Sequence, residues 1–180
     1  MAAGLLFLFL AAAAFGQVNI SSSPGWQSWY PRVAVDPEGN VNVVWMELYG
    51  SGNGDIFYSR LAKSTGLWSA PVNLSESGRV WSDTLITCGL DVDDAGNLYV
   101  VWSAQNAVML RVRTSSGWSN VSQIGSGSGL DGPKIAATGG GDLFCVWWSS
   151  DGTIITRARI NGSWEGAQQV SEGGRRSKFP

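Results

Sequence analysis

An all-β fold of repeated four-stranded antiparallel sheets is what the sequence predicts, and three observations predict it. The chain of 180 residues carries a similar segment three times, and the copies end on Trp45, Trp102 and Trp147. Each copy reads as an apolar strand, a turn rich in Gly, Asp and Asn, and a second apolar strand. No stretch after the N-terminal segment has the 3.6-residue hydrophobic period of an amphipathic helix. Repetition at this spacing is typical of a stack of small sheets.

Four strands are expected in each unit. In the first unit they are residues 32–36, 41–45, 56–60 and 68–74. The second strand is apolar on both faces, as in a strand that lies between two neighbouring sheets, whereas the third strand alternates apolar and polar residues in the later copies. Residues 37–40 read Pro-Glu-Gly-Asn, which is typical of a tight turn between the first two strands.

Acidic residues at the start of these turns have a structural interpretation. Asp36 in the first copy and Asp93 in the second can accept hydrogen bonds from the turn amides. Asp91 and Asp94 lie beside Asp93, and such a group also resembles a calcium loop, but the bidentate Glu that ends such a loop is missing. We therefore predict no metal and no other cofactor.

The strand count predicts the architecture. Four antiparallel strands in about 45 residues match one blade of a β-propeller. The expected blades are residues 31–75, 87–124 and 132–171, and residues 18–21 repeat the end of an outer strand. Residues 177–180 repeat the start of a further blade. Because a ring needs about four to eight blades, about three complete blades form an incomplete ring. Further blades of a longer protein, or self-association of this chain, would close it.

The N-terminal segment has the composition of an export signal. The apolar run from Leu5 to Ala14 is too short to cross a bilayer, and the small residues Ala14 and Gly16 suit a signal peptidase. The sequence predicts a signal peptide at residues 1–16 and a mature chain at 17–180; an uncleaved anchor is the alternative. The expected location is secreted and extracellular, with the periplasm or the cell surface as alternatives, and with no membrane contact after cleavage.

Composition excludes several functions. The net charge is −2 and only 14% of residues are charged, so we expect no nucleic-acid partner. The chain has no histidine, so a Ser-His-Asp or Cys-His catalytic system cannot be built. Cys88 and Cys145 lie in apolar strand patterns of different repeats, which favours two buried free thiols over a disulfide.

Three segments carry a resemblance to a known group of proteins. They read Pro-Arg-Val-Ala-Val-Asp at 31–36, Ile-Phe-Tyr-Ser-Arg at 56–60 and Trp-Ser-Ala-Pro-Val-Asn-Leu-Ser at 68–75. This pattern resembles exported bacterial β-propellers of the sialidase-like group with BNR (neuraminidase) repeats. The resemblance implies the fold, and it implies either carbohydrate binding or glycoside hydrolysis. The group's Arg-Ile-Pro motif stands here as Pro-Arg-Val, and its Asp-box has only a partial match at residues 149–153.

Aromatic residues are the candidates for ligand binding. Six tryptophans recur at two fixed places in the repeats, and we expect them in the core. The remaining tryptophans and two tyrosines fall just before a first strand or just after a second strand, and both places open on one face of a propeller. Stacking on sugar rings and packing between blades both stay open as interpretations. The candidates are Trp26, Trp29, Tyr30, Tyr49, Trp81 and Trp148.

The expected function is a non-catalytic module that binds an extracellular glycan or protein through these loops. The alternative is a sialidase-like glycoside hydrolase whose catalytic residues lie partly in further blades, with Arg32, Glu47 and Asp83 as weak candidates here. A spacer without a specific ligand is a third hypothesis. We interpret the arginines that recur on the third strands as a solvated strand face; they are Arg60, Arg111 and Arg157. The sequence does not predict the oligomeric state.

Overall fold

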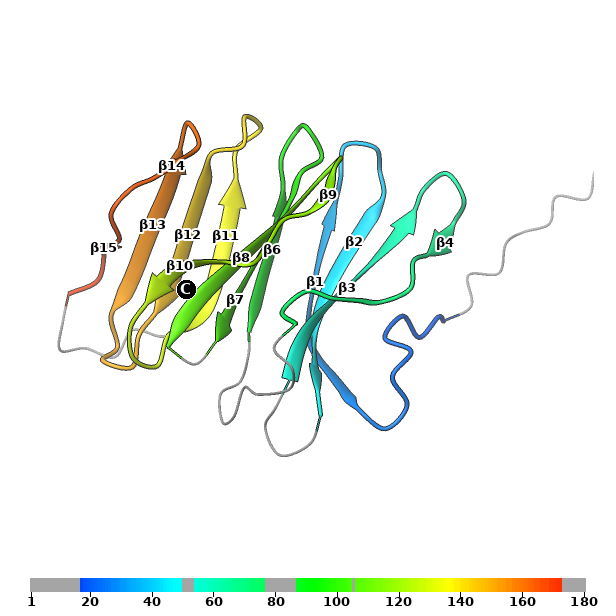
Figure 1. The fold of residues 1–180 in the computed structure, drawn as a ribbon, viewed down its shortest axis with the longest axis horizontal. Helices are drawn as coiled ribbons and strands as arrows, with labels where there is room; N and C mark the ends of the chain where they lie inside the picture. The colour runs from blue at the N-terminus through cyan, green and yellow to red at the C-terminus, as the bar shows by residue number, and fades with distance from the viewer. Residues whose placement is uncertain (1–16, 50–53, 77–86, 105, 173–180) are drawn as a thin grey trace, which may run out of the picture.

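The computed structural model describes residues 17–49, 54–76, 87–104 and 106–172. Within these ranges the chain is all-β, and its strands form three antiparallel sheets that stand side by side along the molecule (Figure 1). The predicted fold class of propeller-like blades is confirmed. The described residues include no helix with the length and apolar character needed to cross a bilayer. The predicted signal peptide at 1–16 and the predicted start of a further blade at 177–180 lie outside the described residues.

Each sheet has three main strands, followed by two further strands that form its outer edge. The first sheet contains β1 (Gln27–Val35), β2 (Val41–Leu48), β3 (Gly54–Ala62), β4 (Leu67–Trp68) and β5 (Val72–Asn73). The second contains β6 (Cys88–Val92), β7 (Leu98–Ala104), β8 (Ala107–Thr114), β9 (Gly117–Trp118) and β10 (Ser122–Ser126). The third contains β11 (Asp131–Ala137), β12 (Leu143–Trp148), β13 (Ile154–Ile160), β14 (Ser163–Trp164) and β15 (Gln168–Gln169). The last two strands of each sheet both pair with its third strand, so they are two parts of one interrupted outer strand.

The first strand is longer than predicted. β1 begins at Gln27 and passes through a bulge between Trp29 and Arg32, so Trp29 and Tyr30 lie in a strand and not in a loop. Tyr30 has a φ of 52°, and Gly132, at the same place in the bulge of β11, has a φ of 63°. This left-handed backbone costs an L-residue about 1 kcal/mol that glycine does not lose. Tyr30 is therefore held in a strained conformation.

The segment before β1 lies against the first sheet. Residues 18–21, which we expected to form an outer strand, are not assigned as a strand. Together with Ser28, Pro31, Val43 and Trp45 they line a cavity of about 240 Å³. Pairing of residues 18–21 with a last blade stays a prediction.

Two apolar cores lie between the three sheets. Trp102 packs in the core between the first and second sheets, and Trp147 packs in the core between the second and third sheets. Both are buried, as is Trp45, so the core prediction is confirmed for the tryptophan that ends each second strand. The recurrent tryptophans of the outer strands are half-buried; they are Trp68, Trp118 and Trp164.

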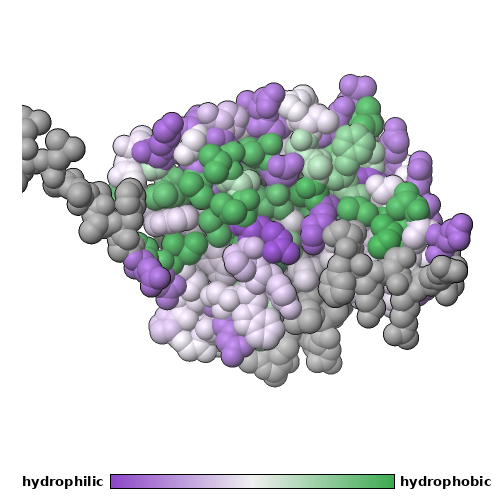
Figure 2. Space-filling model, turned by 180° about the vertical axis from the view of Figure 1, so that it is seen from behind, coloured by the Kyte–Doolittle hydropathy of each residue, from purple (hydrophilic) through white to green (hydrophobic). Residues whose placement is uncertain are grey.

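Part of the outer face of the first sheet and the outer face of the third sheet remain open. Val33 and Val35 of β1 and Phe144 of β12 are exposed. A band of apolar side chains also crosses the surface seen from behind (Figure 2). No sheet among the described residues covers these two faces. The buried junctions show what such faces are suited to pack against, namely another sheet of the same kind.

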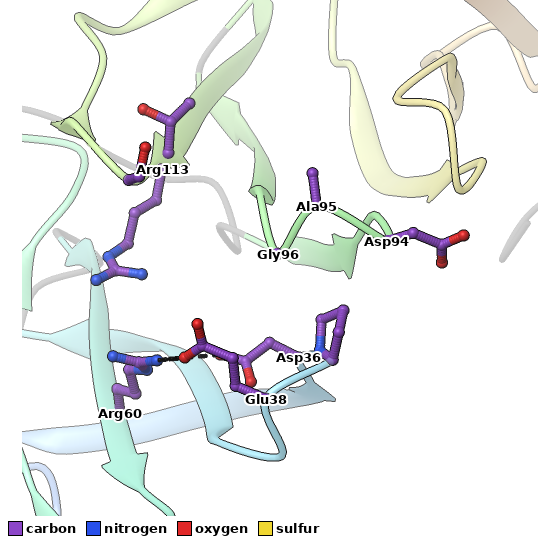
Figure 3. Close-up of a pocket in the computed structure, with 10 residues that line it drawn as sticks. Asp36, Glu38, Arg60, Asp94, Ala95, Gly96 and Arg113 are labelled. Atoms are coloured by element: carbon purple, nitrogen blue, oxygen red, sulfur yellow. Dashed lines mark hydrogen bonds and ion pairs between the residues drawn. The ribbon is translucent and has the colours of Figure 1, made fainter.

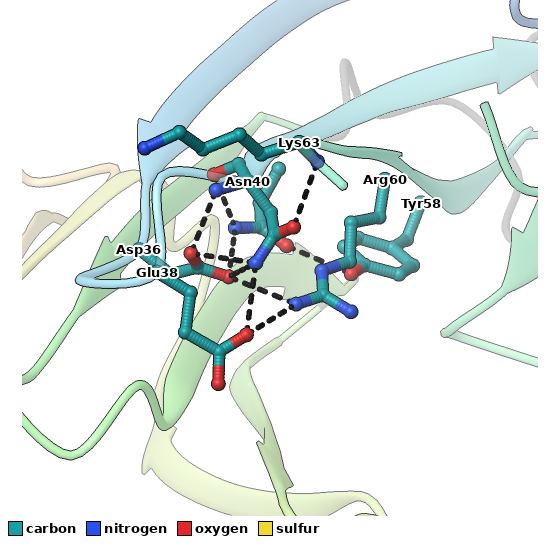
Figure 4. Close-up of polar contacts among 7 residues, drawn as sticks. Asp36, Glu38, Asn40, Tyr58, Arg60 and Lys63 are labelled. Atoms are coloured by element: carbon teal, nitrogen blue, oxygen red, sulfur yellow. Dashed lines mark hydrogen bonds and ion pairs between the residues drawn. The ribbon is translucent and has the colours of Figure 1, made fainter. Parts of the chain in front are cut away.

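Side chains at the start of the turns hold the first two strands together. Asp36 accepts hydrogen bonds from the backbone N–H of Asn40 at 2.8 Å and from its side-chain amide at 2.9 Å (Figure 4). Asp93 accepts the same two bonds from Asn97, each at 2.8 Å. In the third copy the Thr138 hydroxyl accepts the corresponding backbone bond. The structural interpretation of Asp36 and Asp93 is confirmed.

The two cysteines are separate and buried. Cys88 begins β6 and lies in the first core, whereas Cys145 lies in β12 and in the second core. Both are free thiols, as the sequence favoured.

Candidate functional site

The loops that we expected to carry a site open at one end of the sheets, the lower end in Figure 1. Gln27 at the start of β1 lies opposite Leu48 at the end of β2, and Asp131 lies opposite Trp148 in the third sheet. The connection into each first strand and the connection out of each second strand therefore meet there. We call this end of the sheets the loop end, and the opposite end the turn end.

Four candidate aromatic residues form two ring pairs at the loop end of the first sheet. Trp26 and Tyr49 meet edge to face, with ring centroids 4.8 Å apart. Trp29 and Tyr30 also meet edge to face, at 6.0 Å. Trp26 keeps 40% of its surface exposed and Trp29 keeps 38%, whereas Tyr30 packs partly against the first core. The two tryptophans thus offer aromatic surface to a ligand, and Tyr30 serves mainly in packing between sheets.

The other aromatic candidates do not join this group. Trp148 is the last residue of β12 and belongs to the third sheet, so the second sheet separates it from the two ring pairs. Trp81 and the weak catalytic candidate Asp83 lie outside the described residues.

Glu47 holds the approach to β1 against β2. The residue is only 2% exposed. It accepts hydrogen bonds from the hydroxyl of Ser23 at 2.5 Å, the hydroxyl of Ser28 at 3.1 Å and the indole N–H of Trp45 at 2.8 Å. These donors satisfy a carboxylate that would otherwise be costly to bury. Glu47 therefore fixes the segment that carries the exposed tryptophans.

A second buried carboxylate lies next to Glu47. Asp55 is directly opposite it on β3 and accepts hydrogen bonds from the hydroxyl of Ser75 at 2.5 Å and from the amide of Asn73 at 2.9 Å. Both acidic residues are only 2% exposed. The two acids of a glycosidase must flank a bound glycoside, and neither of these buried groups is placed to do so.

Arg32, the other weak catalytic candidate, lies on the opposite face of the first sheet. It is paired with Val44, which belongs to the core shared with the second sheet, whereas Glu47 shares its face with Trp45. The guanidinium of Arg32 donates a hydrogen bond to the carbonyl of Pro31 at 3.0 Å. Arg32 and Glu47 therefore do not converge on one site.

A charged cleft lies at the turn end, between the first and second sheets. It has a volume of about 360 Å³, and Arg60 of β3 and Arg113 of β8 point toward each other across it (Figure 3). Nη2 of Arg60 is 3.3 Å from the carboxylate of Asp36 and 3.2 Å from that of Glu38. Arg60 is thus tied to the turn that precedes β2 (Figure 4), and we interpret this cleft as a structural ion-pair network.

Strand register corrects the grouping of the arginines. In each sheet we compare the second-strand residue that lies two positions before the recurrent tryptophan. Its cross-strand partner on the third strand is Ser59 in the first sheet, Arg111 in the second and Arg157 in the third. Arg60 is one residue out of step, so only Arg111 and Arg157 are equivalent. The prediction of a solvated strand face is wrong for these two, because each contacts the neighbouring sheet.

Arg111 and Arg157 make the same contact at the two junctions between sheets. Nη1 of Arg111 donates to the carbonyl of Leu74 at 2.8 Å, and Nη1 of Arg157 donates to the carbonyl of Ile124 at 2.7 Å. In both cases Nε donates to a carbonyl of the arginine's own sheet. This role could not be predicted from the sequence, because the acceptors are backbone atoms of another repeat.

Comparisons with known proteins support the fold alone. No family model and no curated protein sequence matches the chain. The chain is similar to the crystal structure of AofleA from Arthrobotrys oligospora, with a TM-score of 0.58 and 13% identity over 88% of this chain and 46% of that one. A variant of AofleA with three arginines changed to alanine gives a TM-score of 0.55 and 15% identity, over 84% and 44% of the two chains. The chain thus spans less than half the length of AofleA.

One further structure is more distant. A protein of unknown function from Dyadobacter fermentans matches with a TM-score of 0.38 and 8% identity, over 87% of this chain and 71% of that one. This similarity is too low to support an inference. None of these three structures is described as a sialidase, so the sialidase-like resemblance stays a prediction.

Proposed function

We propose that this protein is an exported carbohydrate-binding module, and that the loop end of its first sheet is the binding surface. The observation that carries the proposal is the exposure of Trp26 and Trp29 at the place where two kinds of loop meet. Large aromatic side chains left in water are uncommon and mark places where a partner binds. Flat rings with a polar N–H at one edge suit the apolar face of a sugar ring and its hydroxyl groups.

The surroundings of the two tryptophans support a preorganised surface. Glu47 anchors the segment before β1 through two serine hydroxyls. Tyr30, next to Trp29, keeps a left-handed backbone where the third sheet has glycine. Strain of this kind concentrates at functional sites, where the surrounding structure maintains it.

The sequence analysis bears on where the protein acts and therefore on which glycan it would meet. The signal-like segment at 1–16 favours export, so the glycan would be an extracellular one. A protein ligand on the same aromatic surface is the other outcome that the experiment must be able to report.

Glycan-array binding tests the proposal with three purified variants, Trp26→Ala, Trp29→Ala and Leu67→Ala. Leu67 is a matched control because it is also exposed and apolar but lies in β4 at the turn end. We expect the wild type and Leu67→Ala to bind the same glycans, and each tryptophan variant to lose about tenfold or more in affinity, as for loss of an aromatic anchor. Absence of glycan binding by the folded wild type would overturn the proposal. So would unchanged binding by both tryptophan variants.

A further inference from the structure

The guanidinium groups of Arg111 and Arg157, which lie at the first and second junctions between sheets, differ in their hydrogen-bond partners. At the first junction the carboxylate of Glu76 accepts a hydrogen bond from Nη1 of Arg111 at 2.8 Å. Glu76 follows Leu74 by two residues, and the residue that follows Ile124 by two is Ser126. The second junction therefore repeats the arginine but lacks the carboxylate that pairs with it at the first junction.

A cavity lies at the second junction, beside the arginine. Its volume is about 380 Å³, within the range of small-ligand sites. Trp147 and Ile155 contribute apolar wall, Ser126 contributes a polar edge, and Arg157 is the only charged residue among the described residues that line it. The cavity is thus partly apolar and carries a single positive charge.

We propose that this cavity binds a ligand that carries a carboxylate, and that Arg157 is the residue that recognises it. Arginine presents its N–H groups in a planar fork that matches a carboxylate. Two of its five N–H groups donate to backbone carbonyls, so the guanidinium has further donors for a ligand. The contact between Glu76 and Arg111 shows within the same molecule that an arginine in this position accepts a carboxylate partner.

Two further features prepare Arg157 for this role. Its guanidinium carbon lies 5.2 Å from the centre of the Trp164 ring, which restricts the orientation of the charged group. The indole N–H of Trp147, a residue that lines the cavity, is buried and has no hydrogen-bond partner among the described residues, and the same holds for Trp102 at the first junction. A buried donor without a partner costs free energy, and a polar ligand in the cavity is one way to offset that cost.

The carboxylate has two possible sources, an acidic sugar or a small organic acid. Calorimetric titration of the full chain with D-glucuronate, D-glucose and L-lactate distinguishes them. Glucuronate and glucose share a pyranose ring and differ in the carboxylate, so we expect glucuronate to bind about tenfold or more tightly than glucose. Binding of lactate as tight as that of glucuronate identifies an organic-acid site, and preference for glucuronate identifies an acidic-sugar site.

A cavity-filling variant tests the location without disturbing the arginine. Ala167 lines the cavity and is exposed, so Ala167→Leu fills space while every hydrogen bond of Arg157 remains. The matched control is Ala70→Leu, an exposed alanine in the corresponding connection of the first sheet. We expect a loss of about tenfold in carboxylate affinity for Ala167→Leu and no change for Ala70→Leu.

Three results would overturn the inference: no binding of either acid, binding of glucose as tight as that of glucuronate, or unchanged affinity in Ala167→Leu. The site does not depend on the loop-end surface, because the two lie on different sheets. Trp29→Ala should therefore retain carboxylate binding. A protein that binds carboxylates in this cavity but no glycan on an array would refute the proposed function alone.

Discussion

Nη1 of Arg157 in the third sheet donates a hydrogen bond to the backbone carbonyl of Ile124 in the second sheet, at 2.7 Å. Arg111 makes the equivalent bond from the second sheet to Leu74 in the first. At each junction this arginine adds a polar link to the apolar core, and the link runs from a third strand to the outer strand of the preceding sheet. Such links fix the spacing of neighbouring sheets because they require one alignment of donor and acceptor.

Replacing this arginine should weaken the junction. Arg157→Met keeps a long apolar side chain but removes the bond to Ile124, and we expect a loss of about 1.5 kcal/mol in the free energy of unfolding, typical of a hydrogen bond to a charged group. Arg159→Met is the control, because the hydrogen bond of Arg159 to Gly162, at 3.1 Å, lies within its own sheet. Urea unfolding measures both. Equal destabilisation by the two variants would show that the link between sheets contributes nothing specific.

The turn that begins at Asp36 offers a second prediction. Asp36→Ala removes the acceptor for the backbone and side chain of Asn40, both buried, and should cost about 2 kcal/mol because buried donors lose their partner. Asp94→Ala, one residue after Asp93 on the exposed side of the neighbouring turn, should change the free energy of unfolding by less than about 0.5 kcal/mol. Thermal unfolding of both variants checks this, and a small effect of Asp36→Ala would contradict the structural role.

Acid should destabilise the protein partly through the same residue. Burial acts to raise the pKa of Asp36, but hydrogen bonds from Asn40 and Asn42 and the charge of Arg60 outweigh it and hold this pKa below its ordinary value of 3.8. The folded state therefore favours the carboxylate, and this contribution is present above pH 3.8 and lost as pH falls through the lowered pKa. The unfolding temperature of Asp36→Asn should fall less steeply below this pH than that of the wild type. Parallel curves would exclude Asp36 as a source of acid sensitivity.

Much of the fold could be predicted because it depends on patterns of residues that are close together in the sequence. The three second strands ending on Trp45, Trp102 and Trp147 indicate buried strands by composition alone, and Asp36 and Asp93 indicate turns because Asp bonds to amides a few residues away. Such signals depend on neighbours in sequence. The tryptophan recurs in all three copies, whereas the third copy has Thr138 in place of the turn Asp.

The site could be predicted only in part, because its geometry depends on partners distant in sequence. Arg60 and Arg111 both lie on a third strand and look equivalent, yet only the pairing with the second strand shows that they are one residue out of step. The alternation of apolar and polar residues does not indicate the bulge at Tyr30. The burial of Glu47 depends on Ser23, which lies 24 residues away.

The two thiols give a prediction at alkaline pH. Burial raises the pKa of Cys88 to about 11 and that of Cys145 to about 12, from an ordinary value of 9.0. The native protein should therefore react with a thiol reagent near pH 8 only after unfolding, since the thiolate is the reactive form.

The stability that depends on neutral Cys88 is complete below pH 9 and is lost as pH rises toward 11. Between pH 9 and 11, the free energy of unfolding should fall less steeply with pH for Cys88→Ala than for the wild type. Rapid labelling of the folded protein would contradict the assigned burial.

The exposed apolar residues on the outer faces of the first and third sheets predict self-association, in which residues 18–21 would have to move away from Val43 and Trp45. Phe144 alternates along β12 with Leu143 and Cys145, which pack on the second sheet, so it points the other way. Val33 likewise faces away from the second sheet, because it pairs with Val43. At both internal junctions, the sheet face equivalent to that of Phe144 packs on the face of the next sheet that is equivalent to that of Val33. The third sheet of one copy can therefore pack on the first sheet of another copy, head to tail.

Sedimentation should show an average mass that rises with the concentration of this chain. Phe144→Lys should abolish this rise by placing a charge on one of the two faces, since a buried unpaired charge is costly. Leu67→Lys, which alters an even more exposed apolar residue on an outer strand, should leave it unchanged. A wild type that stays monomeric at every concentration would show that these faces do not recognise one another. Closure of the propeller would then need blades other than those of a second copy.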